Sequence, residues 1–208
     1  PISTCDFRQT VDDILSGNIV IYVDGKSTAI EINSKGWESR GVEEPDTEAV
    51  VRGPREGFTE TLGTNTALIR RKIRSPKLKF EMVKLGEYTN TDVCICYIKG
   101  IANNDIIETV KRRLKKVRID AILESGYIEE FIEDAPFSLF PTVGNSEKPD
   151  VIAGKLLEGR IAILCDGTPF ALTVPYLLVE VIHASEDYYS RPFFASLVRF
   201  ARVLALFI

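Results

Sequence analysis

Residues 157–174 read LEGRIAILCDGTPFALTV, and residues 15–32 read LSGNIVIYVDGKSTAIEI. Aligned without a gap, the two stretches share a leucine, a glycine, alternating isoleucines and an Asp-Gly pair. In each stretch an apolar run meets Asp-Gly and then resumes, which is typical of a β-hairpin with a tight turn. A chance recurrence of a common pattern is the alternative. We interpret the likeness as a repeat, which predicts two related hairpins, from opposite ends of the chain, that pack together.

The residues between the hairpins have a pattern of their own. Strands are predicted at LKFEMVKLG (78–86) and TDVCICYIKG (91–100), because apolar and β-branched residues dominate both. A helix is predicted at 103–117, where apolar residues recur at helical spacing and Asn104 is available as the N-cap. Strands that alternate with helices indicate an α/β fold with βαβ units.

We therefore expect two small mixed α/β subdomains. The first is predicted to be discontinuous and built on the repeated hairpins, and it joins residues 1–60 to residues 142–190. The second, an inserted subdomain, is predicted at residues 61–141. Two continuous domains in tandem are the alternative. Residues 191–208 are predicted to begin a juxtamembrane helix.

Residues 52–74 read RGPREGFTETLGTNTALIRRKIR and raise the question of an anion site. Glycine, proline and arginine ahead of a helix are typical of a phosphate cradle, but the Gly-Lys-Ser/Thr ending of a phosphate-binding loop is missing. On a helical wheel Asn65 falls in the apolar sector, where it needs a hydrogen-bond partner. We favour a structural or subunit-contact element over an anion site. The candidate residues for either role are Arg52, Arg55, Glu56, Asn65, Arg70 and Arg71.

The sequence offers little support for catalysis or for a bound metal. The one histidine, His183, follows an apolar run and is interpreted as structural, and Asp24 and Asp166 are residues that a tight turn favours. The four cysteines have no metal-ligand spacing, and we interpret them as reduced thiols. The formal net charge of −4 argues against a general nucleic-acid binder. No enzyme activity, cofactor, metal or nucleic-acid partner is therefore predicted.

The last stretch, RPFFASLVRFARVLALFI (191–208), becomes increasingly apolar. We expect it to precede membrane-spanning segments of a longer protein. Arg191, Arg199 and Arg202 among its apolar residues agree with the excess of cations found on the cytoplasmic side of membrane helices.

The pieces RGPREGF, LIRRKIR, LEGR, DGTPF and EDYY, in this order, resemble the A subunits of spore germinant receptors, the GerA family. The resemblance implies a soluble N-terminal domain that precedes transmembrane helices, lies in the spore inner membrane assembly and faces the spore core. It also implies germinant receptor B and C subunits and further A subunits as partners, and no catalytic residues. The function it predicts is receptor assembly and germination signalling. Direct binding of a small-molecule germinant is the alternative, although in this family such recognition is generally assigned to the B subunit.

Overall fold

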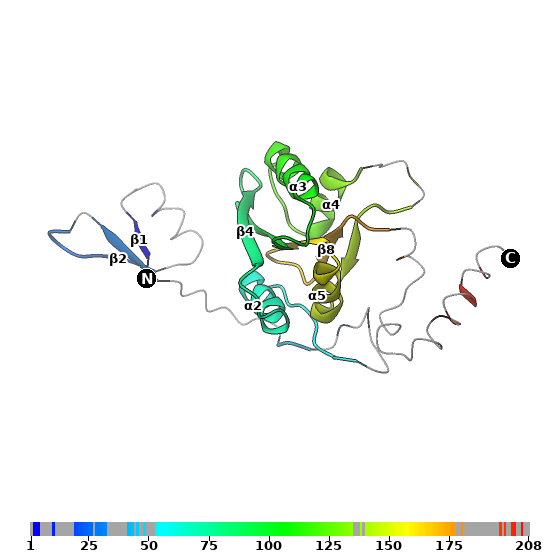
Figure 1. The fold of residues 1–208 in the computed structure, drawn as a ribbon. Coiled ribbons are helices and arrows are strands. Elements are labelled where there is room, and N and C mark those ends of the chain that lie inside the picture. The colour runs from blue at the N-terminus through cyan, green and yellow to red at the C-terminus, as the bar shows by residue number, and fades with distance from the viewer. Residues whose placement is uncertain are drawn as a thin grey trace. The chain divides into compact units, whose positions relative to one another are not determined.

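The computed structural model divides the chain into two compact units, Pro1–Ser39 and Arg40–Ile208 (Figure 1). The residues it describes are 2–4, 10, 19–26, 28–32, 41–43, 45, 48, 53–134, 138, 140–177, 180, 196, 198, 201, 202 and 205. The predicted α/β class is confirmed, because the described residues form two sheets and four helices.

The first unit contains a three-stranded antiparallel sheet of β1 (Ile2–Thr4), β2 (Ile19–Tyr22) and β3 (Ala29–Ile32), in the order β1-β3-β2. Strands β2 and β3 form the predicted hairpin, with Gly25 in the turn at φ +76°. Ile19 pairs with Ile32, and Ile21 pairs with Ile30, so these four isoleucines share one face.

The second unit is built on a five-stranded sheet in the order β4-β5-β7-β8-β6. Its strands are β4 (Leu78–Leu85), β5 (Thr91–Ile98), β6 (Gly144–Ser146), β7 (Ile161–Cys165) and β8 (Ala171–Val174). Every pairing is antiparallel. The predicted strands at 78–86 and 91–100 are confirmed, and the second hairpin forms β7 and β8 at the centre of the sheet.

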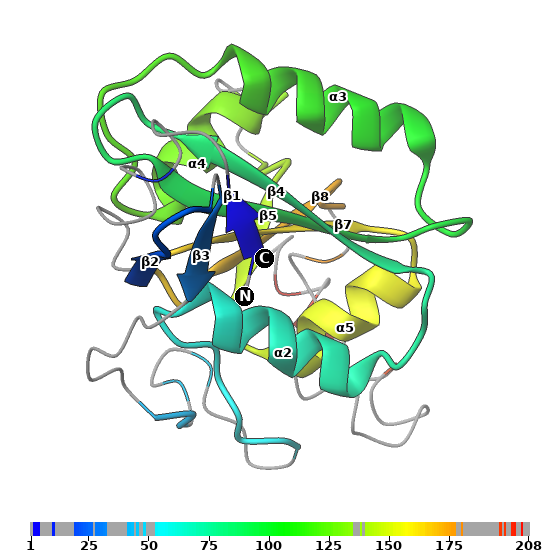
Figure 2. The same cartoon turned by 90° about the vertical axis from the view of Figure 1, so that its left-hand side faces the viewer.

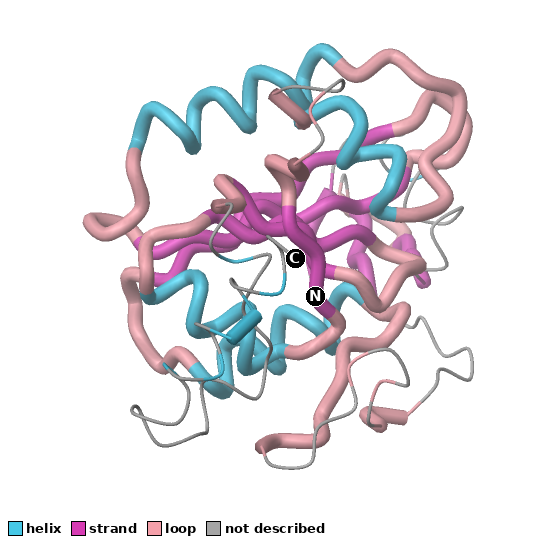
Figure 3. The backbone as a smooth tube through the Cα atoms, turned by 90° about the vertical axis from the view of Figure 1, so that its right-hand side faces the viewer, coloured by secondary structure: helices cyan, strands magenta, loops and turns pink. Residues whose placement is uncertain are grey.

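Helices cover both faces of this sheet (Figures 2 and 3). Helices α2 (Leu62–Lys72) and α5 (Pro149–Leu157) pack on one face, against side chains such as Cys94, Cys96 and Leu164. On the other face, α3 (Asn104–Lys116) and α4 (Ser125–Ile132) pack against Val93, Ile95 and Ile163. Because β5 and β7 are buried from both sides, they are apolar at almost every position.

Three sequence-based predictions are corrected. The division into residues 1–60 plus 142–190 and an inserted 61–141 is wrong, because β5 pairs with β7 and so the supposed insertion and the second hairpin share one sheet. The first hairpin lies in a separate sheet. The βαβ prediction is also wrong, since the described strands pair only antiparallel. The helix predicted at 103–117 is confirmed, but its N-cap is Asn103, whose side chain accepts from the Asp105 amide at 2.9 Å.

Candidate functional site

The loop at residues 53–61 is held against the five-stranded sheet by a buried lysine. Lys148 is fully buried, and its Nζ donates a hydrogen bond of 2.7 Å to the carbonyl oxygen of Pro54. The Phe58 amide donates to the carbonyl of Glu147, also at 2.7 Å. A Cβ atom at Gly57 would lie 2.7 Å from the Pro45 side chain, so only glycine fits there. Gly57 therefore serves close packing.

The N-terminus of α2 already has an anion in place, and it comes from the protein itself. Thr61 at the N-cap makes no side-chain capping bond. Instead, the backbone amide of Leu62 donates to Oδ1 of Asp166 at 2.9 Å, and the Gly167 amide donates to the Glu60 carbonyl at 2.8 Å. A carboxylate near a helix N-terminus is stabilising because it satisfies an unpaired amide and complements the helix dipole. Asp166, which the sequence analysis interpreted as a turn residue, thus occupies the position that a bound phosphate would take at this helix N-terminus.

Asn65 finds the partner that its apolar position required. Its side chain is buried on α2 and bonds both backbone groups of Thr59. Nδ2 donates to the Thr59 carbonyl at 2.6 Å, and Oδ1 accepts from the Thr59 amide at 2.8 Å. Asn65 therefore fixes the loop before α2 and is turned away from solvent.

The remaining candidate residues do not converge on one point. Arg71 and Lys72 form ion pairs with Glu56. Desolvation opposes ionisation of Glu56, but its hydrogen bond from Arg71 and the two neighbouring cations hold its pKa below the ordinary value. Arg70 turns to the sheet, where its guanidinium lies 4.7 Å from the centre of the Phe80 ring. Arg55 is exposed, and Arg52 lies outside the described residues.

A second group of charges lies between α5 and the end of β8. Glu180 accepts from Nζ of Lys155 at 3.3 Å and from a guanidinium nitrogen of Arg160 at 2.6 Å. All three side chains are largely buried. Lys155 Nζ also lies 4.5 Å from the centre of the Tyr176 ring. The group anchors the chain that follows β8 to α5, because separating Glu180 from its partners would leave two buried cations without a counter-charge.

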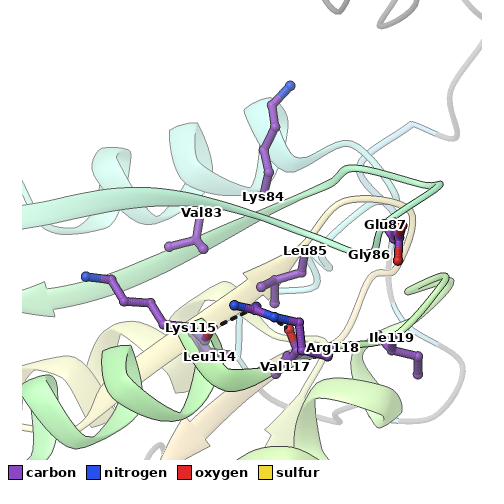
Figure 4. Close-up of a pocket in the computed structure, with 10 residues that line it drawn as sticks. All are labelled: Val83, Lys84, Leu85, Gly86, Glu87, Leu114, Lys115, Val117, Arg118 and Ile119. Carbon is purple, nitrogen blue, oxygen red and sulfur yellow. Dashed lines mark hydrogen bonds between the residues drawn. The ribbon is translucent and has the colours of Figure 1, made fainter.

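A cavity of about 420 Å³ opens where the end of β4 meets the C-terminal end of α3 (Figure 4). Val83, Leu85, Leu114 and Val117 line it together with the polar residues Glu87, Lys115 and Arg118. Arg118 lies on its rim and is fixed there by hydrogen bonds to the carbonyls of Lys115 and Val117. Lys84 projects to the opposite side of β4 (Figure 4). The cavity could admit a small molecule with an apolar part, yet it contains none of the candidate residues predicted from the sequence.

The described thiols are buried. Cys94, Cys96 and Cys165 are free, with 3.7 Å between the Sγ atoms of Cys94 and Cys96. Burial raises the pKa of Cys165 to about 12, with help from the nearby carboxylates of Asp166 and Glu124. Across the described residues, no group of His, Cys, Asp and Glu side chains is placed to hold a metal ion. Within that same part of the chain, no helix has the length and apolar character needed to cross a bilayer. His183 lies outside it.

Sequence reasoning missed the residues that shape this region most. Lys148 belongs to a polar stretch whose pattern is that of a surface linker, and only the following Pro149 hints at the helix start that buries it. Lys155 and Arg160 flank the glycine that ends α5, and nothing in their spacing to Glu180 indicates an ion pair. The sequence does mark Asp166, because the repeated hairpins place it at the same position as Asp24. It does not show that Asp166 caps α2, because that contact depends on tertiary structure.

Comparison with known proteins gives a consistent result. A family model described as "Bacillus/Clostridium GerA spore germination protein" matches residues 2–208. "Spore germination protein KA" of Bacillus subtilis (strain 168) is 50% identical over 196 residues, which are 94% of this chain and 36% of that protein. "Spore germination protein GerLA" of Bacillus cereus is 42% identical over 197 residues, 95% of this chain and 40% of that protein. The chain thus spans about two fifths of the length of the curated relatives it matches.

One solved structure is similar in sequence over part of the chain. It is the crystal structure of the N-terminal domain of the A subunit of the Bacillus megaterium spore germinant receptor GerK3, with 54% identity. The match covers 59% of this chain and 97% of that one, with a TM-score of 0.48.

Proposed function

The chain belongs to the GerA family of spore germination proteins, and from this premise we propose that it is the N-terminal domain of a germinant-receptor A subunit. Its role is to assemble the receptor and to take part in germination signalling. The observation that carries the proposal is the family match over residues 2–208, together with 50% identity to a spore germination protein along nearly the whole chain.

The proposed partners are the germinant receptor B and C subunits and further copies of the A subunit. The proposed location is the spore inner membrane, with this domain on the cytoplasmic side, which faces the spore core. Three free and buried thiols support that side, because disulfides are rare in reducing compartments. The membrane attachment is assigned to the part of the longer relatives that this chain does not span.

The proposed role is binding rather than catalysis. The polar side chains of the described core serve the fold: Asp166 caps α2, Lys148 holds the loop at residues 53–61, and Glu180 ties down the chain after β8. Arg71 forms an ion pair with Glu56, and such a pair gives the surface a defined shape that another protein can bind. Arg52, Arg55, Glu56, Arg70 and Arg71 remain our candidates for subunit contact, whereas Asn65 is buried and bonds Thr59 in the loop before α2.

Deletion tests the proposal directly. In spores whose receptor A subunit carries this domain, residues 1–177 are removed from the gene and the remaining protein is quantified in the membrane. We expect the B subunit to be lost from the purified receptor and germinant-triggered ion release to stop. A protein that accumulates normally, holds the B subunit and still supports full ion release would contradict the proposed role.

A second candidate function, binding of a small-molecule germinant, is favoured by one observation, the cavity between β4 and α3. A ligand of that cavity would stabilise the fold by about 2.7 kcal/mol at a hundredfold excess over its Kd. The test is a thermal-shift screen of amino acids, sugars and salts with the wild-type chain and with Arg118→Ala. A shift seen in the wild type and lost in Arg118→Ala supports binding there, and no shift with any compound argues against it.

A further inference from the structure

Large apolar side chains on α4 and just before it are exposed, and none of the described residues of the second unit covers them. Leu123 is 65% exposed, Tyr127 37% and Phe131 41%. Tyr127 and Phe131, four residues apart, lie along one side of the helix, and Leu123 precedes the helix start at Ser125. Ile128 and Ile132, which lie about 100° further round the helix, are buried in the core. An exposed stripe of large apolar residues is typical of a protein contact.

Acidic residues border this stripe. Glu124 and Glu130 are exposed beside it, and α4 contains no lysine or arginine. Carboxylates in the last turn of a helix also oppose the helix dipole. Burial, followed by repulsion from Glu133 and Glu124, raises the pKa of Glu129. We call Leu123, Glu124, Tyr127, Glu130 and Phe131 the α4 face; its chemistry calls for a partner that brings cations around an apolar centre.

A surface with that chemistry lies elsewhere on the same chain. Phe80, Met82 and Lys84 alternate along β4 and share the side of the sheet on which α2 packs. Met82 is 57% exposed, Lys84 is exposed, and Arg70 stacks on the Phe80 ring. Strand β4 is an edge strand, so this surface continues to the rim of the sheet. We call Arg70, Phe80, Met82 and Lys84 the β4 face.

The two faces cannot meet within one molecule. Helix α4 packs on α3 and β8, on one side of the sheet, whereas the β4 face belongs to the other side (Figures 2 and 3). In the strand order, β8 and β4 are also separated by β5 and β7. The faces therefore point away from each other and can be joined only between two copies.

We propose that the α4 face of one copy binds the β4 face of a second copy, head to tail. This inference rests on the proposed role in receptor assembly and names the surfaces involved. Met82 contacts the rings of Tyr127 and Phe131, a favourable sulfur–aromatic pairing, while Lys84 and Arg70 face Glu130 and Glu124. Contact between two like faces is disfavoured, because it would oppose charges of the same sign.

Head-to-tail contacts repeat until the rotation between copies closes a ring. Each face consists of only a few side chains, so the area it can bury is far smaller than the roughly 800 Å² per partner of a stable interface. The contact is consequently weak between free chains and becomes effective when copies are held near one another. Its test must therefore detect a transient contact.

Cysteine cross-linking meets that requirement. In a Cys5→Ser background, Tyr127→Cys and Met82→Cys are placed in separate, differently tagged chains, and mild oxidation is applied. We expect a disulfide-linked dimer in the mixture and none from either variant alone. Both positions are exposed, and unfolding curves of the two variants verify the fold. The absence of a cross-link in the mixture, or equal cross-linking of like variants, would overturn the proposal.

Charge reversal gives a second readout. With the cysteines in place, Glu130→Lys in the first chain or Lys84→Glu in the second should lower the cross-link yield by about threefold or more, and combining them should restore it. Lys116→Glu, an exposed change on α3, is the matched control. A cross-link yield that falls in the single charge reversals and is not restored when they are combined argues against direct pairing of the two faces.

The outcome is separable from that of the deletion test. If the cross-link fails while deletion of the domain still abolishes ion release, the interface is wrong and the proposed function stands. If the cross-link forms while spores without the domain germinate normally, the interface stands and the proposed function fails.

Discussion

The carboxylate of Asp166 caps a helix that begins 104 residues earlier in the chain, accepting the Leu62 amide at 2.9 Å. The bond joins the turn of the second hairpin to the start of α2. The Asp166 amide in turn donates to the Asp92 carbonyl at 2.9 Å. One turn residue thus links α2, β5 and the β7–β8 hairpin.

Replacing this cap should weaken the second unit. We expect Asp166→Ala to lower the free energy of unfolding by about 1 kcal/mol, the usual cost of losing a capping side chain. Asp24→Ala, at the matching position of the first hairpin, is the control and should leave the unfolding of the second unit unchanged. Urea denaturation followed by circular dichroism measures both, and equal effects of the two substitutions would contradict the assigned role.

Removing the amine of Lys148 should release the loop at residues 53–61. Lys148→Met keeps most of the side-chain volume but leaves the Pro54 carbonyl without its donor, at a cost of about 1–3 kcal/mol. We also expect faster cleavage by trypsin at Arg55. Lys116→Met, on the exposed side of α3, should stay within about 0.5 kcal/mol of the wild type. An unchanged cleavage rate in Lys148→Met would show that other contacts hold the loop.

We expect Glu180 to contribute more to stability than its position after the last strand of the sheet suggests. In Glu180→Gln the cations of Lys155 and Arg160 stay largely buried without a counter-charge, so we expect a loss of about 3 kcal/mol in the free energy of unfolding. The exposed Glu158→Gln is the matched control. A double-mutant cycle with Lys155→Met isolates the pair, and a coupling energy near zero would rule out the ion pair as the cause.

Thiol reactivity should report the burial of β7. With a pKa of about 12, Cys165 has a thiolate fraction of only ~10⁻⁴ at pH 8, so its modification should be ~10³-fold slower than that of a free cysteine. The measurement is disulfide exchange with a chromogenic reagent in a Cys5→Ser chain, first native and then in denaturant. Because Cys94 and Cys96 are buried on β5, rapid reaction of the native chain would mean that β5 or β7 opens readily.

The burial of Glu129 and the repulsion from neighbouring carboxylates predict a defined pH dependence of stability. Its folded-state pKa lies above the ordinary value, so the folded chain holds a proton more tightly than the unfolded chain, and stability falls as pH rises through the folded pKa. Glu129→Gln should therefore be more stable than the wild type at pH 7, with a difference that shrinks below pH ~4. The comparison is made by urea unfolding at both pH values, and a constant difference would exclude titration of Glu129 as its source.

Local patterns in the sequence predicted the elements well. The alternation in β4, the apolar run of β5 and the stripe of Ile107, Val110 and Leu114 on α3 all depend on burial of one or both faces, which the spacing of apolar residues records directly. The need of Asn65 for a partner was predictable for the same reason.

The partners of those elements were not predictable. Two hairpins of similar sequence join different sheets, because the isoleucines of β2 face outward while β7 is covered on both sides by helices. Lys148, Glu180 and Asp166 act through bonds to residues 20 to 104 positions away, and no local pattern encodes such separations. Of the candidate site, the sequence indicated the basic residues but neither their separation nor the cavity beside Arg118.

The pairing of β5 with β7 has a consequence for synthesis on the ribosome. Strand β5 ends at Ile98 and its partner begins at Ile161, so its inner edge stays unpaired until roughly sixty further residues have been made. At about 5–20 residues per second this takes ~3–12 s. During that interval VCICYI, a segment with high strand propensity and no charge, presents an open edge of the kind that seeds intermolecular β-structure. The nascent chain is thus most prone to aggregate between translation of β5 and of β7, and slowing elongation there should lower the yield of folded protein.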